Sequence, residues 1–124
     1  METLSASEKL AALGHESRLS IYRLLVEAGP AGVHASAICD QLSLAPATAS
    51  FHLSHLSRVG LIRGERESRF IRYSADFAEM DALMAFLTRN CCQGEACPPQ
   101  AAASAATPGR PRRLAVSTSR RARP

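Results

Sequence analysis

The sequence predicts a mainly α-helical domain that carries one small β-hairpin. Apolar residues recur at helical spacing along most of residues 1–90, but the pattern changes over residues 61–75, where two short strands fit instead. A proline also stands directly after a short turn between two helical stretches, at a position that suits the start of a helix. The 124 residues allow one domain with a modest core, which we expect over residues 1–97, followed by a tail at residues 98–124.

Two helices are predicted at the start of the chain. Residues 1–13 form a short amphipathic helix with Leu4 on its apolar side, and Gly14 ends it. Residues 15–28 form a second helix. The Gly29-Pro30-Ala31-Gly32 segment closes this helix, because glycine and proline interrupt helical structure.

Residues 35–62 predict two more helices joined by a short turn. Ile38 and Leu42 lie four residues apart and therefore share one face of the first helix. The turn falls at residues 44–45, and the second helix covers residues 46–59, with its proline at the first helical position. An apolar stripe at helical spacing follows in the residues Ala49, Leu53, Leu56 and Leu61.

The opposite face of the second helix indicates what this helix pair does. It is mostly small or hydrogen-bonding and carries no acid: Thr48, Ser50, Phe51, His52, Ser54 and His55. A helix that enters the major groove needs short polar groups and no carboxylates that would repel phosphates. We therefore interpret residues 46–59 as the recognition helix of a helix-turn-helix and expect Thr48, Ser50, His52 and His55 in the groove. The alternative is a plain two-helix hairpin with a face rich in serine and threonine.

A basic β-hairpin is predicted directly after this helix. The strands cover residues 61–65 and 70–74, and a polar turn covers residues 66–69. Four arginines belong to the hairpin: Arg63, Arg66, Arg69 and Arg72. A basic hairpin directly after a recognition helix is typical of a wing. We expect its Arg66 and Arg69 to contact phosphates or the minor groove. The alternative is an ordinary solvated hairpin.

The last predicted helix runs from residue 77 to about residue 90 and is apolar nearly all round. Its widest apolar face holds Phe77, Met80, Leu83, Met84 and Leu87. Such a helix must be buried on more than one side, and the chain is too small to bury it alone. We therefore expect a twofold homodimer through this helix and the first one. The dimer would place two recognition helices roughly 34 Å apart, which is one turn of DNA.

Three of the four cysteines lie close together after this helix. Cys91 and Cys92 are adjacent, and Cys97 follows five residues later. Neighbouring residues of a regular helix point about 100° apart, so the two adjacent thiols share a ligand only where the helix frays. Asn90 and Gly94 favour such fraying, because both tolerate the left-handed conformation that ends helices. Three thiolates form a soft, three-coordinate site that suits thiophilic cations.

Other uses of the cysteines remain open. Structural zinc needs four ligands, and the four histidines all lie far upstream in the sequence. A redox pair of Cys92 and Cys97, a different metal, or no ligand at all are the alternatives. Cys39 lies on the helix of Ile38 and Leu42, and we expect it to act as a small buried hydrophobe.

Charge and composition narrow the functional class. The tail at residues 98–124 holds six arginines and no acid, so residues 1–97 carry about −2 of the total charge of +4. DNA binding must therefore come from local clustering of charge, and we expect the tail to be disordered. The sequence shows no membrane-spanning run and no secretion pattern, which predicts a cytoplasmic protein. It contains no phosphate-binding loop or catalytic set, so we expect no enzyme.

The order of these elements resembles the ArsR/SmtB family of winged-helix metalloregulatory repressors. Residues 14–19 are similar to the family's early helix, and residues 45–56 resemble its recognition helix. The stretch at residues 87–92, with Cys97 nearby, resembles the arsenic-responsive members, whose site for trivalent arsenic lies at the end of the last helix. The resemblance covers about residues 1–97.

The resemblance implies a homodimer that occupies operator DNA, represses arsenic-resistance genes and dissociates when As(III) binds Cys91, Cys92 and Cys97. Trivalent antimony is a second candidate inducer, and a thiol-based redox repressor or a sensor of another thiophilic metal is the alternative function. Two departures stand out. The Cys-x-Cys positions of many members fall on His34 and Ser36, and Phe51 replaces the arginine or glutamine that often precedes the histidine.

Overall fold

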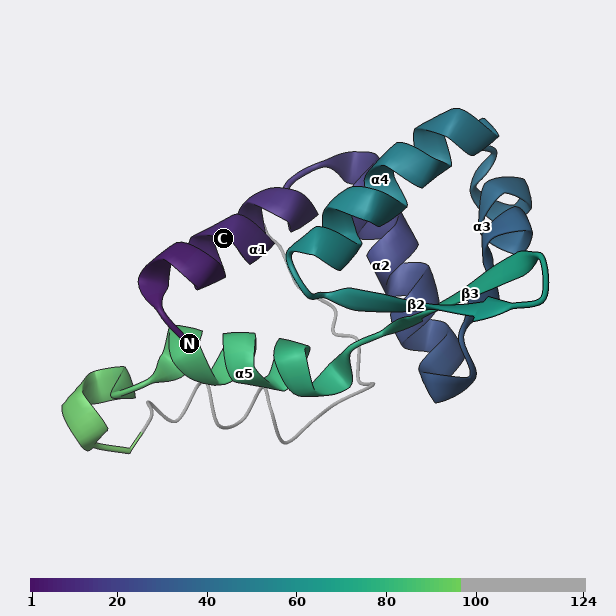
Figure 1. Cartoon of the computed structure of the whole chain (residues 1–124). Coiled ribbons are helices and arrows are strands. Elements are labelled where there is room, and N and C mark those ends of the chain that lie inside the picture. The colour runs from purple at the N-terminus through teal and green to yellow at the C-terminus, as the bar shows by residue number, and fades with distance from the viewer. Residues whose placement is uncertain (97–124) are drawn as a thin grey trace, which may run out of the picture. The chain divides into compact units, whose positions relative to one another are not determined.

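The computed structural model describes residues 1–96, and the chain divides into two units, Met1–Thr88 and Arg89–Pro124. The first unit carries the helices and strands that the sequence predicts, together with one strand that it does not (Figure 1). The helices are α1 (Thr3–Leu13), α2 (Glu16–Ala28), α3 (Ala35–Leu42), α4 (Pro46–Arg58) and α5 (Phe77–Thr88). The strands are β1 (Val33–His34), β2 (Ile62–Glu67) and β3 (Phe70–Ala75), and a short 3₁₀ turn covers Gly29–Ala31. The predicted mainly helical fold with a β-hairpin is confirmed.

Local side-chain and backbone chemistry sets the ends of α2. The Nδ1 atom of His15 accepts a hydrogen bond at 3.1 Å from the backbone N–H of Ser17, which caps the first turn of the helix. At the other end Gly29 adopts φ +77°, a conformation that side-chain-bearing residues rarely adopt, so the helix stops there. The predicted helix of residues 15–28 differs from the observed α2 only at His15, which caps the helix and is not part of it.

The turn between α3 and α4 is tight. Ser43 adopts the left-handed conformation with φ 55°, and the N–H of Leu44 donates to the carbonyl oxygen of Cys39 at 3.0 Å. Pro46 then occupies the first turn of α4, where its missing N–H costs no hydrogen bond. The helix-turn-helix predicted from residues 35–62 is therefore present.

The sheet differs from the expected two-stranded hairpin. It has three antiparallel strands in the order β1-β3-β2, because Val33 and His34 pair with Tyr73 and Arg72 of the central strand. A strand of two residues is too short to show an alternating pattern, and for this reason β1 could not be predicted from the sequence. The loop between β2 and β3 contains two residues, Ser68 and Arg69, so Arg66 belongs to β2 rather than to the turn.

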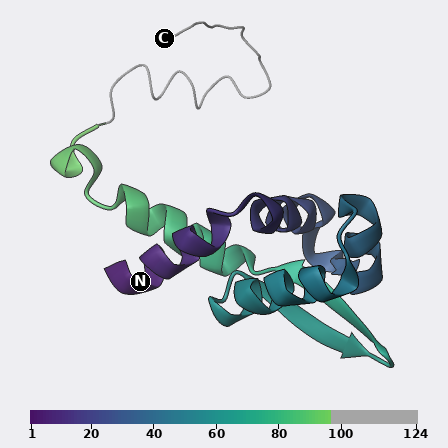
Figure 2. The same cartoon turned by 90° about the horizontal axis from the view of Figure 1, so that it is seen from above.

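The core of the first unit lies between the helices and the base of the sheet. Fully buried residues come from α2, α3, α4, the start of β2 and α5: Ile21, Leu25, Ile38, Leu53, Leu56, Leu61, Ile62 and Leu83. An ion pair of 3.3 Å between Lys9 Nζ and Glu79 Oε1 links α1 to α5. Figure 2 shows α1 and α5 at one end of this unit and the β2–β3 hairpin projecting at the other.

The α5 helix ends earlier than predicted, at Thr88 instead of about residue 90. In the second unit a short 3₁₀ segment covers Cys91–Gly94, and left-handed conformations occur at Asn90, Cys92, Gln93 and Gly94. The backbone at the cysteines is therefore not a regular helix, which is the condition under which the sequence allows Cys91 and Cys92 to share a ligand. Among the helices of residues 1–96, none is long and apolar enough to cross a membrane.

Candidate DNA-binding surface and cysteine segment

The solvent face of α4 is made of small and hydroxyl-bearing residues around one aromatic ring. Thr48, Ser50 and Ser54 are exposed, and Phe51 is 65 % exposed. Ala49 and Leu53 point the other way, into the core. No acidic residue occurs anywhere in the helix, so its exposed face carries no charge that would repel DNA phosphates. Thr48 and Ser50 are thus exposed on the face that the sequence predicts to contact DNA.

His52 is the exception among the predicted groove residues, because its side chain is buried. The residue is only 6 % exposed, and its ring contacts the ring of His15 in a tilted arrangement, with 4.7 Å between centroids and 45° between planes. Its Nδ1 lies 3.4 Å from Nη1 of Arg18. Burial, together with the charges of His15, Arg18 and His55, lowers the pKa of His52 below the ordinary value of 6.5. This position does not fit a base contact, and His52 instead packs α4 against the start of α2.

His55 lies at the edge of the exposed face, on the side of α1. It is half-buried and lines a shallow hollow with Ala11 and Arg58. Burial, with the charges of Arg18 and Arg58, lowers its pKa. A neutral imidazole at this margin offers one hydrogen-bond donor and one acceptor to a ligand that approaches α4.

The four arginines of the hairpin divide into two pairs. Arg63 lies 3.8 Å from Asp76, and Arg72 pairs with Glu67 while donating to the carbonyl oxygen of Ala31 at 3.1 Å. Arg66 and Arg69 are exposed, and neither forms an ion pair within residues 1–96. The two arginines predicted to contact DNA are therefore the two hairpin arginines without an acidic partner in residues 1–96, whereas Arg63 is exposed but lies near Asp76.

Hydrogen bonds brace the hairpin near its tip, between the positions of these two arginines. Glu67 accepts from Arg72 with one carboxylate oxygen, while its other oxygen lies 3.0 Å from Nε2 of His34 on β1. Because Glu67 directly precedes the two-residue turn, this contact ties the tip of the hairpin to the strand that leads into α3. This network could not be predicted from the sequence, because its members lie on three separate strands.

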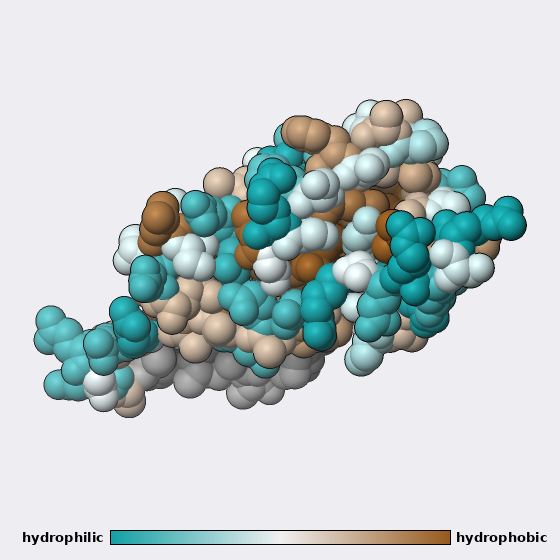
Figure 3. Space-filling view, viewed as in Figure 1, coloured by the Kyte–Doolittle hydropathy of each residue, from teal (hydrophilic) through white to brown (hydrophobic). Residues whose placement is uncertain are grey.

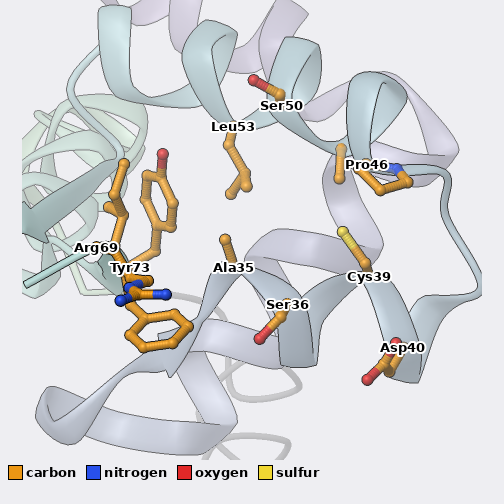
Figure 4. Close-up of a pocket in the computed structure, with 12 residues that line it drawn as sticks. Ala35, Ser36, Cys39, Asp40, Pro46, Ser50, Leu53, Arg69 and Tyr73 are labelled. Atoms are coloured by element: carbon orange, nitrogen blue, oxygen red, sulfur yellow. The ribbon is translucent and has the colours of Figure 1, made fainter.

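A pocket of about 450 Å³ separates the helix-turn-helix from the hairpin. Figure 4 shows Leu53 and Ala35 facing each other across it, with the sulfur of Cys39 on one side and Tyr73 on the other. Apolar side chains are visible in this region of the surface, between α4 and the hairpin (Figure 3). Cys39 packs against the core here, in agreement with its predicted role as a small hydrophobe.

An apolar surface lies on α1 and α5. Four large residues of these helices are well exposed: Leu4, Leu10, Met84 and Leu87. Single exposed apolar residues are common, but several on two linked helices indicate an interface. This surface is where the sequence predicts the partner subunit.

The cysteine segment holds two sulfurs close together. The Sγ atoms of Cys91 and Cys92 lie 3.7 Å apart, and both residues are exposed. Left-handed backbone at Cys92 allows this approach, which a regular helix would prevent. Within residues 1–96 no three His, Cys, Asp or Glu side chains gather into a metal site, and the predicted third ligand, Cys97, lies outside the described residues, as does the tail at residues 98–124.

Comparison with known proteins agrees with this arrangement. A family model described as a helix-turn-helix domain matches residues 13–65. The chain is 34 % identical over 92 residues to the HTH-type transcriptional regulator YbzH of Bacillus subtilis, itself uncharacterized, and the match covers 64 % of this chain and 92 % of that one.

Two solved structures extend the comparison. An ArsR-like transcriptional regulator from Rhodococcus sp. RHA1 is 27 % identical, with a TM-score of 0.64, over 83 % of this chain and 89 % of that one. The chain belongs to the HTH-type transcriptional regulators, and it shares its winged helix-turn-helix fold with this ArsR-like structure. The homodimeric winged helix-turn-helix domain of Mb0332 from Mycobacterium bovis, a possible ArsR-family regulator, is 25 % identical with a TM-score of 0.55, over 76 % of this chain and 87 % of that one.

Membership in these regulators makes the protein a non-enzymatic DNA-binding protein. In such a regulator α4 is the recognition helix and the β2–β3 hairpin is the wing. We refer to these two elements by those names below.

Proposed function

We propose that this regulator is a homodimeric repressor that leaves its operator when trivalent arsenic binds Cys91, Cys92 and Cys97. The observation that carries the proposal is the pair of cysteine sulfurs 3.7 Å apart in an exposed segment directly after α5 in the sequence. The third thiol is the nearby Cys97, and trivalent antimony, which shares the preference for thiolates, is a second candidate inducer.

The sulfur spacing suits a shared soft ion. Bonds between zinc and thiolate are about 2.3 Å long, so two sulfurs on one tetrahedral ion lie about 3.8 Å apart. The observed spacing is close to that value, and the pair needs little movement to bind one centre. Trivalent arsenic completes its bonding with three thiolates, whereas structural zinc requires a fourth ligand. The three clustered cysteines therefore favour arsenic over zinc.

DNA binding in this proposal uses the exposed parts of the recognition helix and the wing. Thr48 and Ser50, with His55 at the margin, approach the major groove, while Arg66 and Arg69 contact phosphates or the minor groove. A second copy joins through the apolar residues of α1 and α5, as in a homodimeric relative. The twofold axis then presents two recognition helices to successive major grooves.

Release of DNA follows from linkage between the two sites. Arsenic lowers the affinity for DNA only if it binds the DNA-free conformation more tightly than the DNA-bound one. One way to couple the sites would be for arsenic to unwind a helical turn at the cysteines. However, α5 ends at Thr88, before the cysteines. In this proposal arsenic therefore acts by fixing the conformation of the segment after α5. A coupling free energy of about 3 kcal/mol would change the DNA affinity about 150-fold.

The test is fluorescence anisotropy of a labelled DNA fragment from the region upstream of the coding sequence, titrated with arsenite under reducing conditions. We expect release near one equivalent of arsenite per chain, and no release from Cys91→Ser. The matched control is Cys39→Ser, which removes the thiol beside the pocket and should leave the arsenite response intact. DNA that stays bound at excess arsenite would rule out the proposed inducer, although not the DNA-binding surface.

A thiol-based redox repressor is the second candidate, and the close approach of Cys91 and Cys92 also favours it. Oxidation would join two thiols of the segment in a disulfide, with Cys92 and Cys97 as the less strained pair. The same titration separates the two functions. Peroxide would then release the DNA and reductant would restore binding, whereas arsenite in excess reductant would have no effect.

A further inference from the structure

Phe51 stands at the centre of the exposed face of the recognition helix. It is 65 % exposed, which is unusual for a phenylalanine, and its neighbours on that face are the short side chains of Ala47, Ser50 and Ser54. Its ring is therefore larger than these three neighbouring side chains and projects beyond them. In a helix that enters the major groove, this ring reaches the base edges first.

The ring of Phe51 also contacts the buried ring of His52. Its edge meets the ring of His52 at 5.6 Å between centroids, with an angle of 63° between the planes. His52 is itself fixed by its contacts with His15 and Arg18. Phe51 thus rests on a buried support, and contact with a base costs it little conformational freedom.

The remaining chemistry of the helix narrows which base feature can be recognised. Arginine or lysine selects guanine, and asparagine or glutamine selects adenine. Aspartate or glutamate selects cytosine. None of these residue types occurs between Pro46 and Ser57. Serine and threonine hydroxyls contact any base, so they discriminate poorly. Arg58 ends the helix and His55 lies at the margin of its exposed face. The contact that Phe51 itself can offer from the middle of this face is an apolar one, with the 5-methyl group of thymine.

We propose that Phe51 reads thymine in the operator by packing its ring on the 5-methyl group. This assignment rests on the proposed binding of DNA through the recognition helix, and it adds the base that this helix selects. The operator half-site should then contain at least one essential A·T pair whose recognition depends on a methyl group and not on hydrogen bonds.

The test replaces thymine by uracil, which removes the methyl group and leaves base pairing unchanged. Duplexes are first selected by the wild-type regulator from a randomised DNA pool, and each thymine is then exchanged in turn. We expect a loss of affinity of about fourfold at the position that Phe51 contacts, which is the value for burying one methyl-sized group. Phe51→Ala should bind the thymine and uracil duplexes equally.

Phe70→Ala is the matched control, because it removes a second exposed phenylalanine, from the wing rather than from the helix. This variant should keep the uracil penalty. The proposal is overturned if uracil has no effect on the wild type, if Phe51→Ala keeps the penalty, or if the pool yields no preferred sequence. Failure to bind any duplex would instead contradict the proposed function, so the two failures are distinguishable.

Discussion

The buried imidazole of His52 makes the stability of the domain depend on pH. Its pKa is lowered in the folded protein, whereas the unfolded chain keeps the ordinary value of 6.5. Between the two values only the unfolded chain binds the proton, so stability is complete above pH 6.5 and is lost as the pH falls toward the folded pKa. We expect urea unfolding to show a steeper loss of stability below pH 6.5 in the wild type than in His52→Gln. Equal slopes would contradict the account.

Arg69 and Arg72 are predicted to differ although they lie three residues apart. Arg69→Ala removes an exposed charge at the wing tip, so it should weaken binding to all sequences alike and reduce the salt dependence by about one phosphate contact. Arg72→Ala removes the partner of Glu67 and should instead lower the free energy of unfolding. Salt titrations of DNA binding and urea unfolding of both variants separate these effects. A changed base preference in Arg69→Ala would count against the wing.

The sequence contained enough information to place His52 correctly. This residue lies three positions after Ala49 and four before Leu56, so helical spacing puts it on the buried stripe. The imidazole of His52 suggested a contact with DNA, whereas its position in the helix indicated burial in the core. The pairing of Arg72 was harder to foresee, because it depends on a carbonyl oxygen more than forty residues away in the chain, at Ala31.

At the scale of elements, the contact between β1 and β3 positions the wing. Gly32 precedes β1 with φ +75°, and a Cβ atom there would overlap the carbonyl oxygen of Tyr73. Gly29 has nearly the same φ, +77°, but open space around it. Gly29→Ala should cost only the backbone strain of about 1–2 kcal/mol. Gly32→Ala adds steric overlap of about 1–3 kcal/mol, which thermal unfolding should resolve. Equal destabilisation by both changes would argue against a close β1–β3 contact.

Elements with a long, regular pattern were predictable, and the short ones were not. The helices α2 and α4 were predicted to within one residue at their ends because capping and turn residues mark them. The strand β1 has only two residues and owes its existence to a partner forty positions later. The predicted hairpin turn was too wide, since Ser68 and Arg69 alone form it and strand pairing continues through Arg66 to Glu67.

At the scale of the whole molecule, the apolar residues of α1 and α5 should hold two copies together. Leu87 on α5 is 52 % exposed, and a charge there would be buried unpaired in the dimer. We expect Leu87→Glu to be monomeric in analytical ultracentrifugation and to lose most of its DNA affinity. Leu19→Glu is the control, because Leu19 is similarly exposed at 45 % but lies on α2. A dimeric Leu87→Glu would show that the interface lies elsewhere.

The proposed response to arsenic belongs to the same scale, because it would couple the cysteine segment to the DNA-binding surface. Cys91 and Cys92 could be recognised from sequence as a thiol pair, and their close approach required the left-handed backbone that the structure supplies. Which ion they bind depends on a third ligand and on differential affinity between two conformations. Neither property is contained in the spacing of the cysteines alone.

The most direct test is to measure the affinity for arsenite twice, once with the free regulator and once with the regulator saturated with operator DNA. Linkage requires that arsenite and DNA weaken each other by the same factor. The account predicts that DNA reduces the arsenite affinity by about 150-fold, equal to the loss of DNA affinity caused by arsenite. Identical arsenite affinities in the two states would contradict an arsenic-responsive repressor.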